Sequence, residues 1–421
     1  MRRALAFAMA IALITVACSA GNSPGTTGAG GSPGGSVAAF DPAAISGNAT
    51  LGEWDSSPAE HSAVSSALAA FSVTYPNVKV DQTTISGDYR AQMITRFGAH
   101  NPPDIFYVNA EYAQDWIDQG FLAPLDDYIA KQGFATSPFF KNYLDIFTGS
   151  DGHIYGLPKD GNTIAMAYNS DLVSTPPTTM DQLVQTAQSL VGKPGIKAPM
   201  CLNAALDRGL AFLYAQGGSL LTADNKAEAI DTPASKAALQ WYMDLFKNGL
   251  GVTNKALGDG WCGEALGKGD VAMTFEGGWL LGFMQTTYPK VNWKFAEMPT
   301  GSSGSKVTIS YTAAYGIGVD SANKDQAWTA LQYLTGTQGM AVWTGGGIAV
   351  PSRSDVPVPD GFDIIVKGAA YSKPGSGFMK GYNDVQTAFA NAFDQEITNK
   401  TYNVDNVIAA TVAAINKALA G

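Results

Sequence analysis

The sequence predicts an α/β fold in which short strands alternate with longer helices. Apolar residues recur at helical spacing in several segments, and short apolar runs bounded by turn residues lie between them. Alternation of this kind argues for a doubly wound α/β layer. At 421 residues the chain is also too long for one ordinary core, which indicates two or three domains or lobes.

The elements of the first half follow one another closely. Residues 49–54 predict a strand. Ser57, Pro58 and Glu60 then form a capping box with proline at the first helical position. The helix that begins there has an apolar face at helical spacing and ends at Pro76. Next we expect a strand over residues 77–85, a helix over 88–99 and a strand over 102–109. The stretch of residues 110–129 is expected to contain a helix that ends near Gly120.

The second half contains helices with clear starts and stops. Thr179 and Gln182 cap one helix. Thr232 and Pro233 begin another, which ends at Gly249. We further expect a strand over residues 270–275, a helix over 279–289, a helix pair over 327–345, and terminal helices over 385–399 and 404–421.

The N-terminus has the pattern of a targeting segment. A basic start and an apolar run over residues 4–17, too short to span a bilayer, are typical of a secretory signal peptide, which we assign to residues 1–17. "TVAC" also resembles the lipobox of bacterial lipoproteins, although Thr15 stands where Leu or a close relative is usual. We therefore expect lipid on Cys18, with a plain secretory signal as the alternative. Residues 18–44 are expected to form a flexible tether, because a Gly/Ser/Pro/Thr tract cannot bury a core.

Charge and cysteine usage restrict the partners. The formal net charge of -10, from 26 Lys+Arg and 36 Asp+Glu, disfavours nucleic acid or an anionic bilayer as the main partner. Once Cys18 carries lipid, Cys201 and Cys262 remain as an even pair in an oxidising compartment. They predict a disulfide, with two separate buried thiols as the alternative.

Several kinds of chemistry lack their motifs. The glycine-rich stretches "FEGGW", "AQGGSLL" and "TGGGIAVP" have neither the lysine of a Walker loop nor the spacing of a dinucleotide turn. The pattern G-x-S-x-G occurs only at residues 21–25 and 30–34, within the expected tether and not between a strand and a helix as a nucleophile elbow requires. The scattered His61, His100 and His153 offer few choices for a triad base and no metal-ligand spacing. A secreted glycoside-active enzyme stays open as an alternative, because paired carboxylates could come from Glu53, Asp55, Glu111, Asp160 and Glu276.

Predicted strands repeatedly end in an aromatic residue beside hydrogen-bonding side chains. The three groups are Trp54 with Asp55, Ser56 and Ser57, Tyr107 with Asn109 and Glu111, and Phe275 with Glu276 and Trp279. In open α/β sheets, ligands lie at the carboxyl ends of the strands. Aromatic faces beside carboxylates and amides suit a sugar, whose C–H faces stack while its hydroxyls form hydrogen bonds. The alternative for each aromatic taken singly is packing in the core.

Four stretches carry motifs that occur together in one known family. "AAFSVTYPNVKV" has a helix ending in an aromatic-Pro turn, and "NPPDIFYVNAEYAQDWIDQGFLAPLDDYI" ends in Gly-x-Leu-x-Pro-Leu-Asp. "DGHIYGLPKDGNTIAMAYNSDL" runs from Gly-Leu-Pro-x-Asp to Tyr-Asn, and "GKGDVAMTFEGGW" resembles the signature Gly-x-Ala-Met-x-x-x-Gly-x-Trp, with one more residue after the first glycine. From about Ala49 to the C-terminus, the chain resembles the extracellular solute-binding proteins of ABC importers, the family that includes maltose-binding protein.

The resemblance implies a type II periplasmic-binding-protein-like fold with two hinged, discontinuous α/β lobes. The N-terminal lobe would comprise residues 45–163 and 300–347, and the C-terminal lobe residues 164–299 and 348–421. Crossings between lobes are expected after Asn162, near Pro299 and around residues 347–351. Ligand would close the cleft between the lobes.

The resemblance also implies a function without turnover and without a cofactor. We expect a monomer, lipid-anchored on the extracellular face of the cell membrane, that captures a mono- to oligosaccharide and delivers it to ABC transporter permease subunits. A polyamine or another small solute is the alternative ligand. The ligand-binding residues carried over by position are Trp54, Ser56, Ser57, Tyr89, Asn109, Glu111, Asp160, Asn162, Arg208, Glu276, Gly278, Trp279, Tyr311 and Tyr315. The further rim candidates are Trp261, Trp343 and Arg353. Arg208 could instead form a surface salt bridge, and Tyr89 could pack within its lobe.

Overall fold

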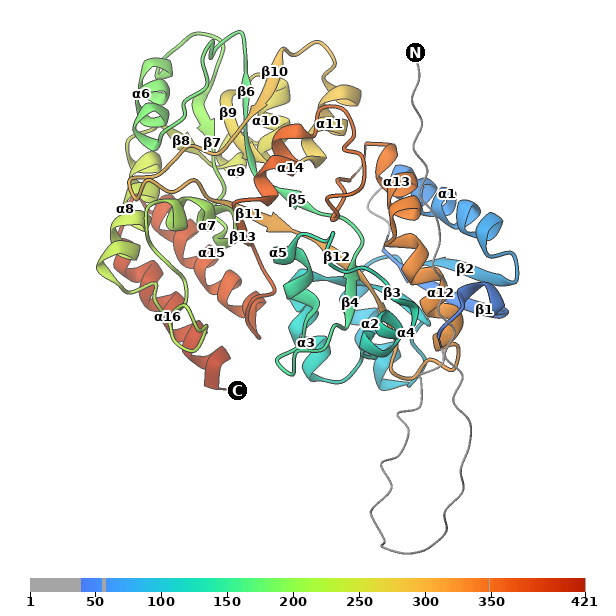
Figure 1. Cartoon of the computed structure of the whole chain (residues 1–421). Helices are drawn as coiled ribbons and strands as arrows, with labels where there is room; N and C mark the ends of the chain where they lie inside the picture. The colour runs from blue at the N-terminus through green and yellow to red at the C-terminus, as the bar shows by residue number, and fades with distance from the viewer. Residues whose placement is uncertain (1–38, 55–57, 348, 421) are drawn as a thin grey trace, which may run out of the picture. The chain divides into compact units, whose positions relative to one another are not determined.

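The structure, a computed structural model, describes residues 39–54, 58–347 and 349–420. The described chain forms one compact unit that begins at Ala39. Two of its sheets have five strands each and are flanked by helices, and a three-stranded sheet lies between them (Figure 1). The predictions that fall outside the described residues are the signal peptide, the lipidation of Cys18, and the site residues Ser56 and Ser57.

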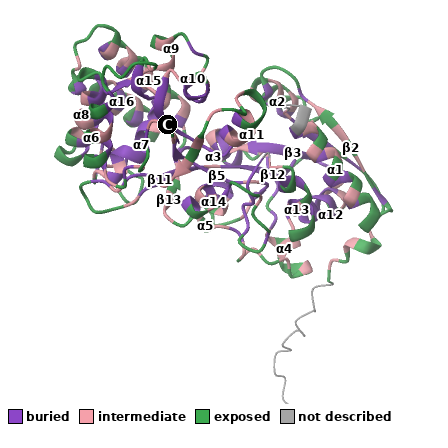
Figure 2. Ribbon diagram, turned by 90° about the horizontal axis from the view of Figure 1, so that it is seen from above, coloured by how far each residue is buried: buried purple, intermediate pink, exposed green. Residues whose placement is uncertain are grey.

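The first lobe is built around the sheet with strand order β2-β1-β3-β12-β4. Its strands are β1 (Gly47–Glu53), β2 (Val78–Thr84), β3 (Ile105–Asn109), β4 (Gly156–Pro158) and β12 (Ala313–Ile317). Its helices are α1 (Pro58–Thr74), α2 (Tyr89–Gly98), α3 (Ala113–Asp118), α4 (Asp126–Gln132), α5 (Lys141–Leu144), α12 (Lys324–Leu334) and α13 (Thr337–Gly345). β1 pairs in parallel with β2 and β3, whereas β12 is antiparallel to β3 and β4. In Figure 2, β3 and β12 are buried, whereas α4 has no buried residue and faces solvent.

The second lobe is built around the sheet with strand order β10-β6-β9-β7-β8. Its strands are β6 (Ala165–Asn169), β7 (Ala198–Cys201), β8 (Gly251–Val252), β9 (Val271–Glu276) and β10 (Trp293–Ala296). Its helices are α6 (Met180–Leu190), α7 (Leu206–Ala215), α8 (Pro233–Lys247), α9 (Asn254–Leu257), α10 (Cys262–Lys268), α11 (Trp279–Thr287), α15 (Tyr382–Thr398) and α16 (Val404–Ala420). β9 lies in the middle of this sheet, and every one of its residues is buried.

The predicted helix starts at Thr179 and Thr232 are confirmed. The Thr179 hydroxyl accepts a hydrogen bond from the Gln182 amide, and the Thr232 hydroxyl accepts one from the Ser235 amide. Each cap satisfies a backbone N–H that has no partner inside its helix. These local contacts explain why the sequence alone located both helices.

The helix expected within residues 110–129 ends near Gly120, as predicted, but it begins with a 3-10 turn. The Asn109 side chain accepts from the Glu111 amide and starts a 3-10 turn over Ala110–Tyr112 before α3 begins. Gly120 has a φ of 70°, a left-handed conformation that favours glycine and ends the helical run. A bridge between Leu122 and Gly318 then ties the chain to the sheet before α4. The predicted end near Gly120 is therefore confirmed, whereas the 3-10 start and the bridge before α4 were not predicted.

The third sheet and α14 (Asp363–Ala369) lie where the chain passes between the lobes (Figure 1). Its strands, in the order β13-β11-β5, are β5 (Asn162–Thr163), β11 (Thr308–Tyr311) and β13 (Ser372–Pro374). The chain leaves the first core after Leu157 and enters the second at Ile164. It returns between Ile309 and Ala314. The last passage lies between Val356 of the first core and Met379 of the second.

The return to the first core therefore occurs later in the chain than the crossing expected near Pro299. The Thr300 amide donates to the Thr178 carbonyl oxygen, and the Met180 amide donates to the Thr300 carbonyl oxygen. Ile309 is fully buried in the second core. These contacts hold residues 300–309 against the second lobe, where no sequence pattern marked them.

The disulfide between Cys201 and Cys262 is confirmed. Cys201 ends β7 and Cys262 begins α10, and both cysteines are buried in a small apolar cluster with Leu266 and Met284. The bond therefore joins the sheet of the second lobe to a helix that packs on it.

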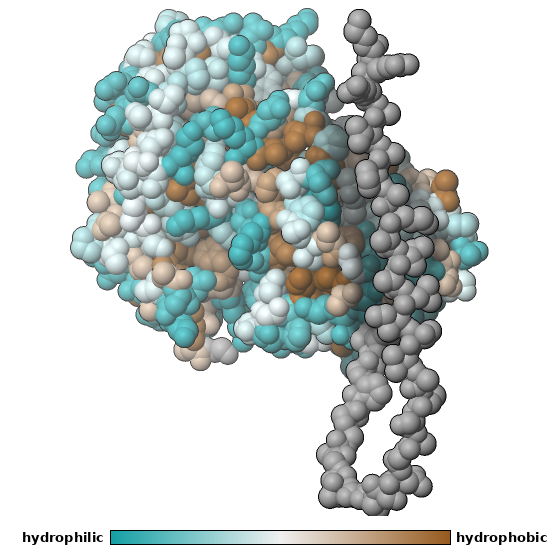
Figure 3. Space-filling view, in the orientation of Figure 1, coloured by the Kyte–Doolittle hydropathy of each residue, from teal (hydrophilic) through white to brown (hydrophobic). Residues whose placement is uncertain are grey.

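On the face of the unit that Figure 3 shows, apolar surface is broken up by polar side chains. Among the described residues, no helix combines the length and the apolar character that a bilayer crossing needs.

Candidate functional site

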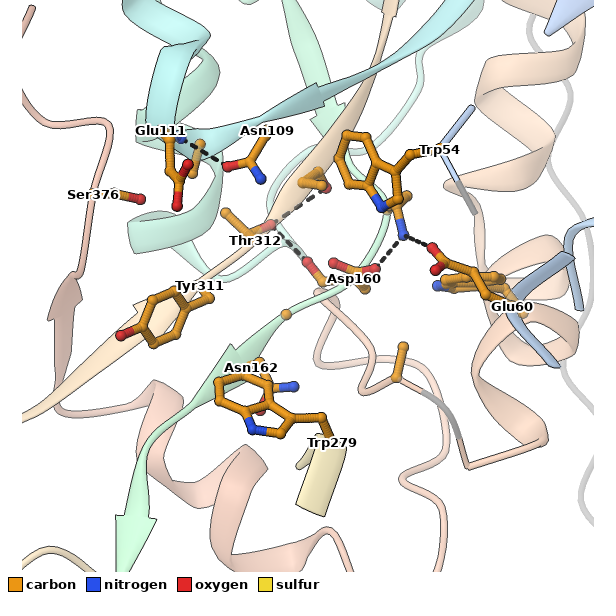
Figure 4. A pocket seen from close by; sticks show the side chains of 16 residues that line it. Trp54, Glu60, Asn109, Glu111, Asp160, Asn162, Trp279, Tyr311, Thr312 and Ser376 are labelled. Atoms are coloured by element: carbon orange, nitrogen blue, oxygen red, sulfur yellow. Dashed lines mark hydrogen bonds and ion pairs between the residues drawn. The ribbon is translucent and has the colours of Figure 1, made fainter. Parts of the chain in front are cut away.

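A cavity of about 270 Å³ lies where the two lobes and the third sheet meet. It is lined by Trp54, Glu60, Asn109, Ala110, Glu111, Lys159, Asp160, Gly161, Asn162, Trp279, Tyr311, Thr312, Ala313, Trp343, Ala349 and Ser376. Figure 4 shows that the labelled side chains converge on one space, with Trp54, Asn109 and Glu111 on one side and Asn162 and Trp279 on the other. The first set follows strands of the first lobe, and the second set comes from the third sheet and the second lobe.

Trp54 follows β1 and is held by aromatic rings behind it. Its ring meets those of Tyr89 and Tyr107 edge-on, with centroids 5.1 and 4.7 Å away. The Tyr89 hydroxyl donates to the Tyr107 carbonyl oxygen at 2.9 Å, and Tyr107 in turn contacts the Tyr315 ring. Tyr89 and Tyr315 are buried and do not line the cavity, so they support Trp54 from the core.

Asn109 and Glu111 follow β3 and bring polar groups to the cavity. The Asn109 side-chain oxygen accepts from the Glu111 amide at 2.9 Å, so that oxygen is already paired within the turn. Burial raises the pKa of the Glu111 carboxyl, the nearby Asp207 adds to the rise, and Arg90 opposes it. Among the described residues, no basic side chain lies within ion-pair distance of Glu111.

Lys159 places a buried positive charge at one side of the cavity. Its ammonium group pairs with the Asp160 carboxylate and lies 3.6 Å from Glu60 Oε1. It also lies over the rings of Tyr107 and Trp343, 4.5 and 4.2 Å from their centroids. Two carboxylates therefore balance this cation, as the dashed contacts in Figure 4 show. The arrangement leaves no unbalanced positive charge to attract an anionic ligand.

Trp279 begins α11 directly after the two glycines that follow β9. Its indole N–H donates to Glu276 Oε2 at 3.0 Å. A Cβ at Gly277 would lie 2.4 Å from the Trp279 ring, so only glycine lets the ring fold back at this turn. At the next residue, the Gly278 amide donates to the Asn162 side-chain oxygen at 2.7 Å. This bond links α11 to β5 and directs the Asn162 amide nitrogen away from Gly278.

Glu276, Arg208 and Tyr311 form the layer behind and beside Trp279. Glu276 is 2% exposed; burial raises the pKa of its carboxyl, while Arg208 acts in the opposite direction. Tyr311 lines the cavity from β11, and its ring meets the Trp279 ring edge-on with centroids 5.7 Å apart. Glu276 and Arg208 do not line the cavity.

The residues predicted from the sequence fall into three groups. Those that line the cavity are Trp54, Asn109, Glu111, Asp160, Asn162, Trp279 and Tyr311. Those that lie behind its walls are Tyr89, Arg208, Glu276, Gly278 and Tyr315. Ser56 and Ser57 lie outside the described residues. Of the rim candidates, Trp343 lines the cavity, whereas Trp261 packs on Phe283 and Arg353 pairs with Asp355.

Sequence reasoning missed several lining residues. Lys159 and Gly161 adjoin predicted residues in the "LPKDGN" stretch, so their position beside Asp160 could have identified them. Thr312 likewise follows Tyr311 and donates to the Asp160 carbonyl oxygen. Ser376 had no comparable signal, because the last passage between the lobes brings it to the cavity.

No metal centre is found in the part of the chain that the structure describes. No group of three or more His, Cys, Asp or Glu side chains is arranged there to hold an ion. Of the acidic side chains that line the cavity, Glu60 and Asp160 contact Lys159.

Comparisons with known proteins agree with this architecture. Residues 55–341 match the family model of the bacterial extracellular solute-binding proteins. A putative binding protein of Brucella abortus (strain 2308) is 25% identical over 312 residues, covering 69% of this chain and 74% of the relative. An ABC substrate-binding protein from Listeria monocytogenes, solved in complex with cycloalternan, superposes with a TM-score of 0.76 at 19% identity, over 89% of this chain and 99% of that one. The sugar-binding protein MalE from Xanthomonas citri superposes with a TM-score of 0.78 at 18% identity, over 89% and 98%.

These similarities confirm the two-lobed α/β fold expected from the sequence. The family model matches well over half of the chain, from the end of β1 to α13. The chain belongs to the family of bacterial extracellular solute-binding proteins.

Proposed function

We propose that this protein captures a mono- to oligosaccharide between its lobes and delivers it to the permease of an ABC transporter. The observation that carries the proposal is the composition of the cavity. The aromatic side chains of Trp54, Trp279 and Tyr311 line the same space as the hydrogen-bonding groups of Asn109 and Asp160 (Figure 4). A pyranose ring needs both, because its C–H faces stack while its hydroxyls donate and accept.

Two further points support a sugar as the ligand. The Listeria protein was solved with cycloalternan, and the Xanthomonas protein is described as sugar-binding. The charged groups of the cavity also disfavour an anionic solute, because Lys159 is already paired with Asp160 and Glu60. The binding mode that we propose is closure of the two lobes about the third sheet, with ligand contacts to both lobes.

The protein is proposed to bind its sugar without cleaving it. A thermal-unfolding screen of the protein from about Ser36 onward tests this with maltotriose, mannotriose, putrescine and spermidine. A sugar at 100 times its Kd should stabilise the fold by about 2.7 kcal/mol. Chromatography should recover that sugar unchanged. A stabilising sugar that is converted to products would contradict the proposal and support the glycoside-active alternative.

A polyamine is the second candidate ligand, and Glu111 is the observation that favours it. Its carboxylate lines the cavity without a basic side chain at ion-pair distance among the described residues. Stabilisation by putrescine or spermidine, with no response to any sugar of the panel, would assign the cavity to polyamines.

We also propose that a lipid on Cys18 holds a monomeric protein at the extracellular face of the membrane. The motif before Cys18 and the tract after it are the support for this part of the proposal. In the native host, Cys18→Ala is expected to move the protein from the membrane fraction to the medium. Retention of the variant in the membrane fraction would contradict lipid anchoring at this residue.

A further inference from the structure

Arg208 lies between the two aromatic rings of the second-lobe wall but does not line the cavity. Its guanidinium carbon is 4.9 Å from the centroid of the Trp279 ring and 5.1 Å from that of the Tyr311 ring. Both rings line the cavity. A guanidinium over an aromatic face is attracted by the ring and restricts its tilt. Arg208 is thus placed to act on the wall from behind.

The indole N–H of Trp279 and the hydroxyl of Tyr311 already form hydrogen bonds with side chains behind the wall. The Trp279 indole N–H donates to Glu276, and the Tyr311 hydroxyl donates to Asp207 Oδ2 at 2.9 Å. Arg208 Nη1 donates to the same Tyr311 hydroxyl at 3.1 Å. The wall therefore presents ring faces to the cavity, while the indole N–H and the hydroxyl are engaged elsewhere.

The charge of Arg208 is balanced within this layer. Its guanidinium lies 3.6 Å from Glu276 and 3.9 Å from Asp207. The Arg208 side chain is 20% exposed. An anionic ligand would have to displace these carboxylates, so Arg208 is poorly suited to bind one.

Three separate elements meet at this guanidinium. Arg208 lies on α7, Trp279 begins α11, and Tyr311 ends β11 of the third sheet. The planes of the Trp279 and Tyr311 rings are 77° apart, and the two rings belong to separate elements. A planar, forked cation can contact both faces and both carboxylates at once, which a lysine ammonium cannot do.

We propose that Arg208 is a positioning residue that holds Trp279 and Tyr311 as a preformed wall for the apolar face of an uncharged ring. It acts through the two aromatic rings and makes no direct contact with the ligand. The inference rests on the proposed function for the nature of the ligand, and on the contacts around Arg208 for the positioning role.

The ligand-free protein offers the first test. In a ¹⁵N spectrum of the protein, which has 8 tryptophans, the Trp279 indole signal is the one that disappears in Trp279→Phe. Arg208→Met should shift or broaden that signal. The matched control is Arg353→Met, which removes a buried arginine of the first lobe that pairs with a carboxylate and lies 4.7 Å from the centroid of the Phe139 ring. It should leave the signal in place. An unmoved Trp279 signal in Arg208→Met would overturn the positioning role.

A double-mutant cycle with maltotriose as the probe offers the second test. Arg208→Met should weaken binding about 10-fold, the size expected for losing a cation–π contact with its hydrogen bonds. In a Trp279→Ala background, where one ring is gone, the same change should cost less than about 3-fold. Equal losses in both backgrounds would show that Arg208 acts independently of Trp279 and would overturn the inference.

Two further outcomes separate this inference from the proposed function. Arg208→Lys keeps the charge without the planar fork, so it should remain about 5-fold weaker than the wild type; full affinity would contradict the positioning role. If the wild-type protein binds no sugar while the indole signal moves in Arg208→Met, the proposed function fails and the positioning role stands.

Discussion

Trp279 shows how single residues at a strand end define the cavity. Its ring lines the space between the lobes, and its N–H is tied to Glu276 three residues earlier. The two intervening glycines allow the tight return of the ring over the turn. From the sequence, Glu276 is a candidate both for a carboxylate of a glycoside-active enzyme and for a ligand-binding residue. The structure places it behind the ring, where it holds Trp279.

Replacing Trp279 tests whether the ring is a binding surface. Trp279→Ala should weaken maltotriose binding by at least about 10-fold, because loss of a stacked ring removes about 1.5 kcal/mol. Calorimetric titration measures the affinity, and thermal unfolding without sugar measures the fold. Trp261→Ala is the matched control, since Trp261 is a partly buried tryptophan of the same lobe that does not line the cavity. Equal losses of affinity in both variants would contradict the assignment.

Glu111 allows the two candidate ligands to be distinguished at one residue. Glu111→Gln keeps a hydrogen-bond acceptor but removes the charge. Sugar affinity should change by less than about 5-fold, whereas spermidine affinity would fall by at least about 10-fold if the ammonium group were the recognised feature. A wild-type protein that binds spermidine and none of the sugars, and whose spermidine affinity falls at least about 10-fold in Glu111→Gln, would favour the polyamine alternative.

At the scale of elements, the sequence predicted those whose signals are local. The helices α6 and α8 were located because Thr179 and Thr232 cap them through contacts three residues away. β9 was located because it is a continuous buried run. The three strands of the third sheet could not be located, since each has two to four residues and gains its partners from distant segments. β11, for example, pairs with β5 and β13 across long separations in the chain.

The same distinction explains how much of the site was predictable. Trp54 follows β1, Asn109 ends β3 and Trp279 comes just after β9, so strand prediction placed them at strand ends. Trp343 and Ser376 reach the cavity through the later passages between the lobes, which depend on tertiary contacts. The sequence also did not predict how deeply each residue lies. It gave no sign that Trp279 lines the cavity whereas Arg208 lies behind the cavity wall.

The disulfide contributes to the stability of the second lobe in a measurable way. It links residues 61 apart in the sequence, so it restricts a long loop of the unfolded chain. Breaking it should lower the free energy of unfolding by about 2–4 kcal/mol. Urea unfolding of the Cys201→Ser/Cys262→Ser variant gives the value. Urea unfolding of the reduced wild-type protein is the control, because it breaks the bond without replacing the cysteine side chains. An unchanged urea midpoint in both the variant and the reduced protein would contradict the prediction.

The whole molecule is two lobes whose cores are separate and whose walls share one cavity. The chain passes between the cores three times, and the third sheet collects these passages beside the cavity. Asn162 and Tyr311 are on these crossing strands and also line the cavity. Ligand contacts and the connection between the lobes therefore involve the same residues.

This arrangement leads to a prediction about lobe closure. A saturating sugar should reduce the radius of gyration measured by small-angle scattering, because ligand contacts to both lobes favour the closed state. At a sugar concentration near the wild-type Kd, the Trp279→Ala variant should show a smaller reduction than the wild type. An unchanged radius in a wild-type sample that calorimetry shows to be saturated would contradict closure on binding.

The central claim is that the cavity between the lobes binds a sugar and releases it unchanged. Calorimetric titration of the wild-type protein with maltotriose and mannotriose, followed by chromatography of the recovered sugar, tests it most directly. The account predicts one site per chain for at least one of these sugars, full recovery of the sugar, and an affinity at least about 10-fold weaker in Trp279→Ala. An absence of binding heat for both sugars, or conversion of the sugar during the titration, would contradict it.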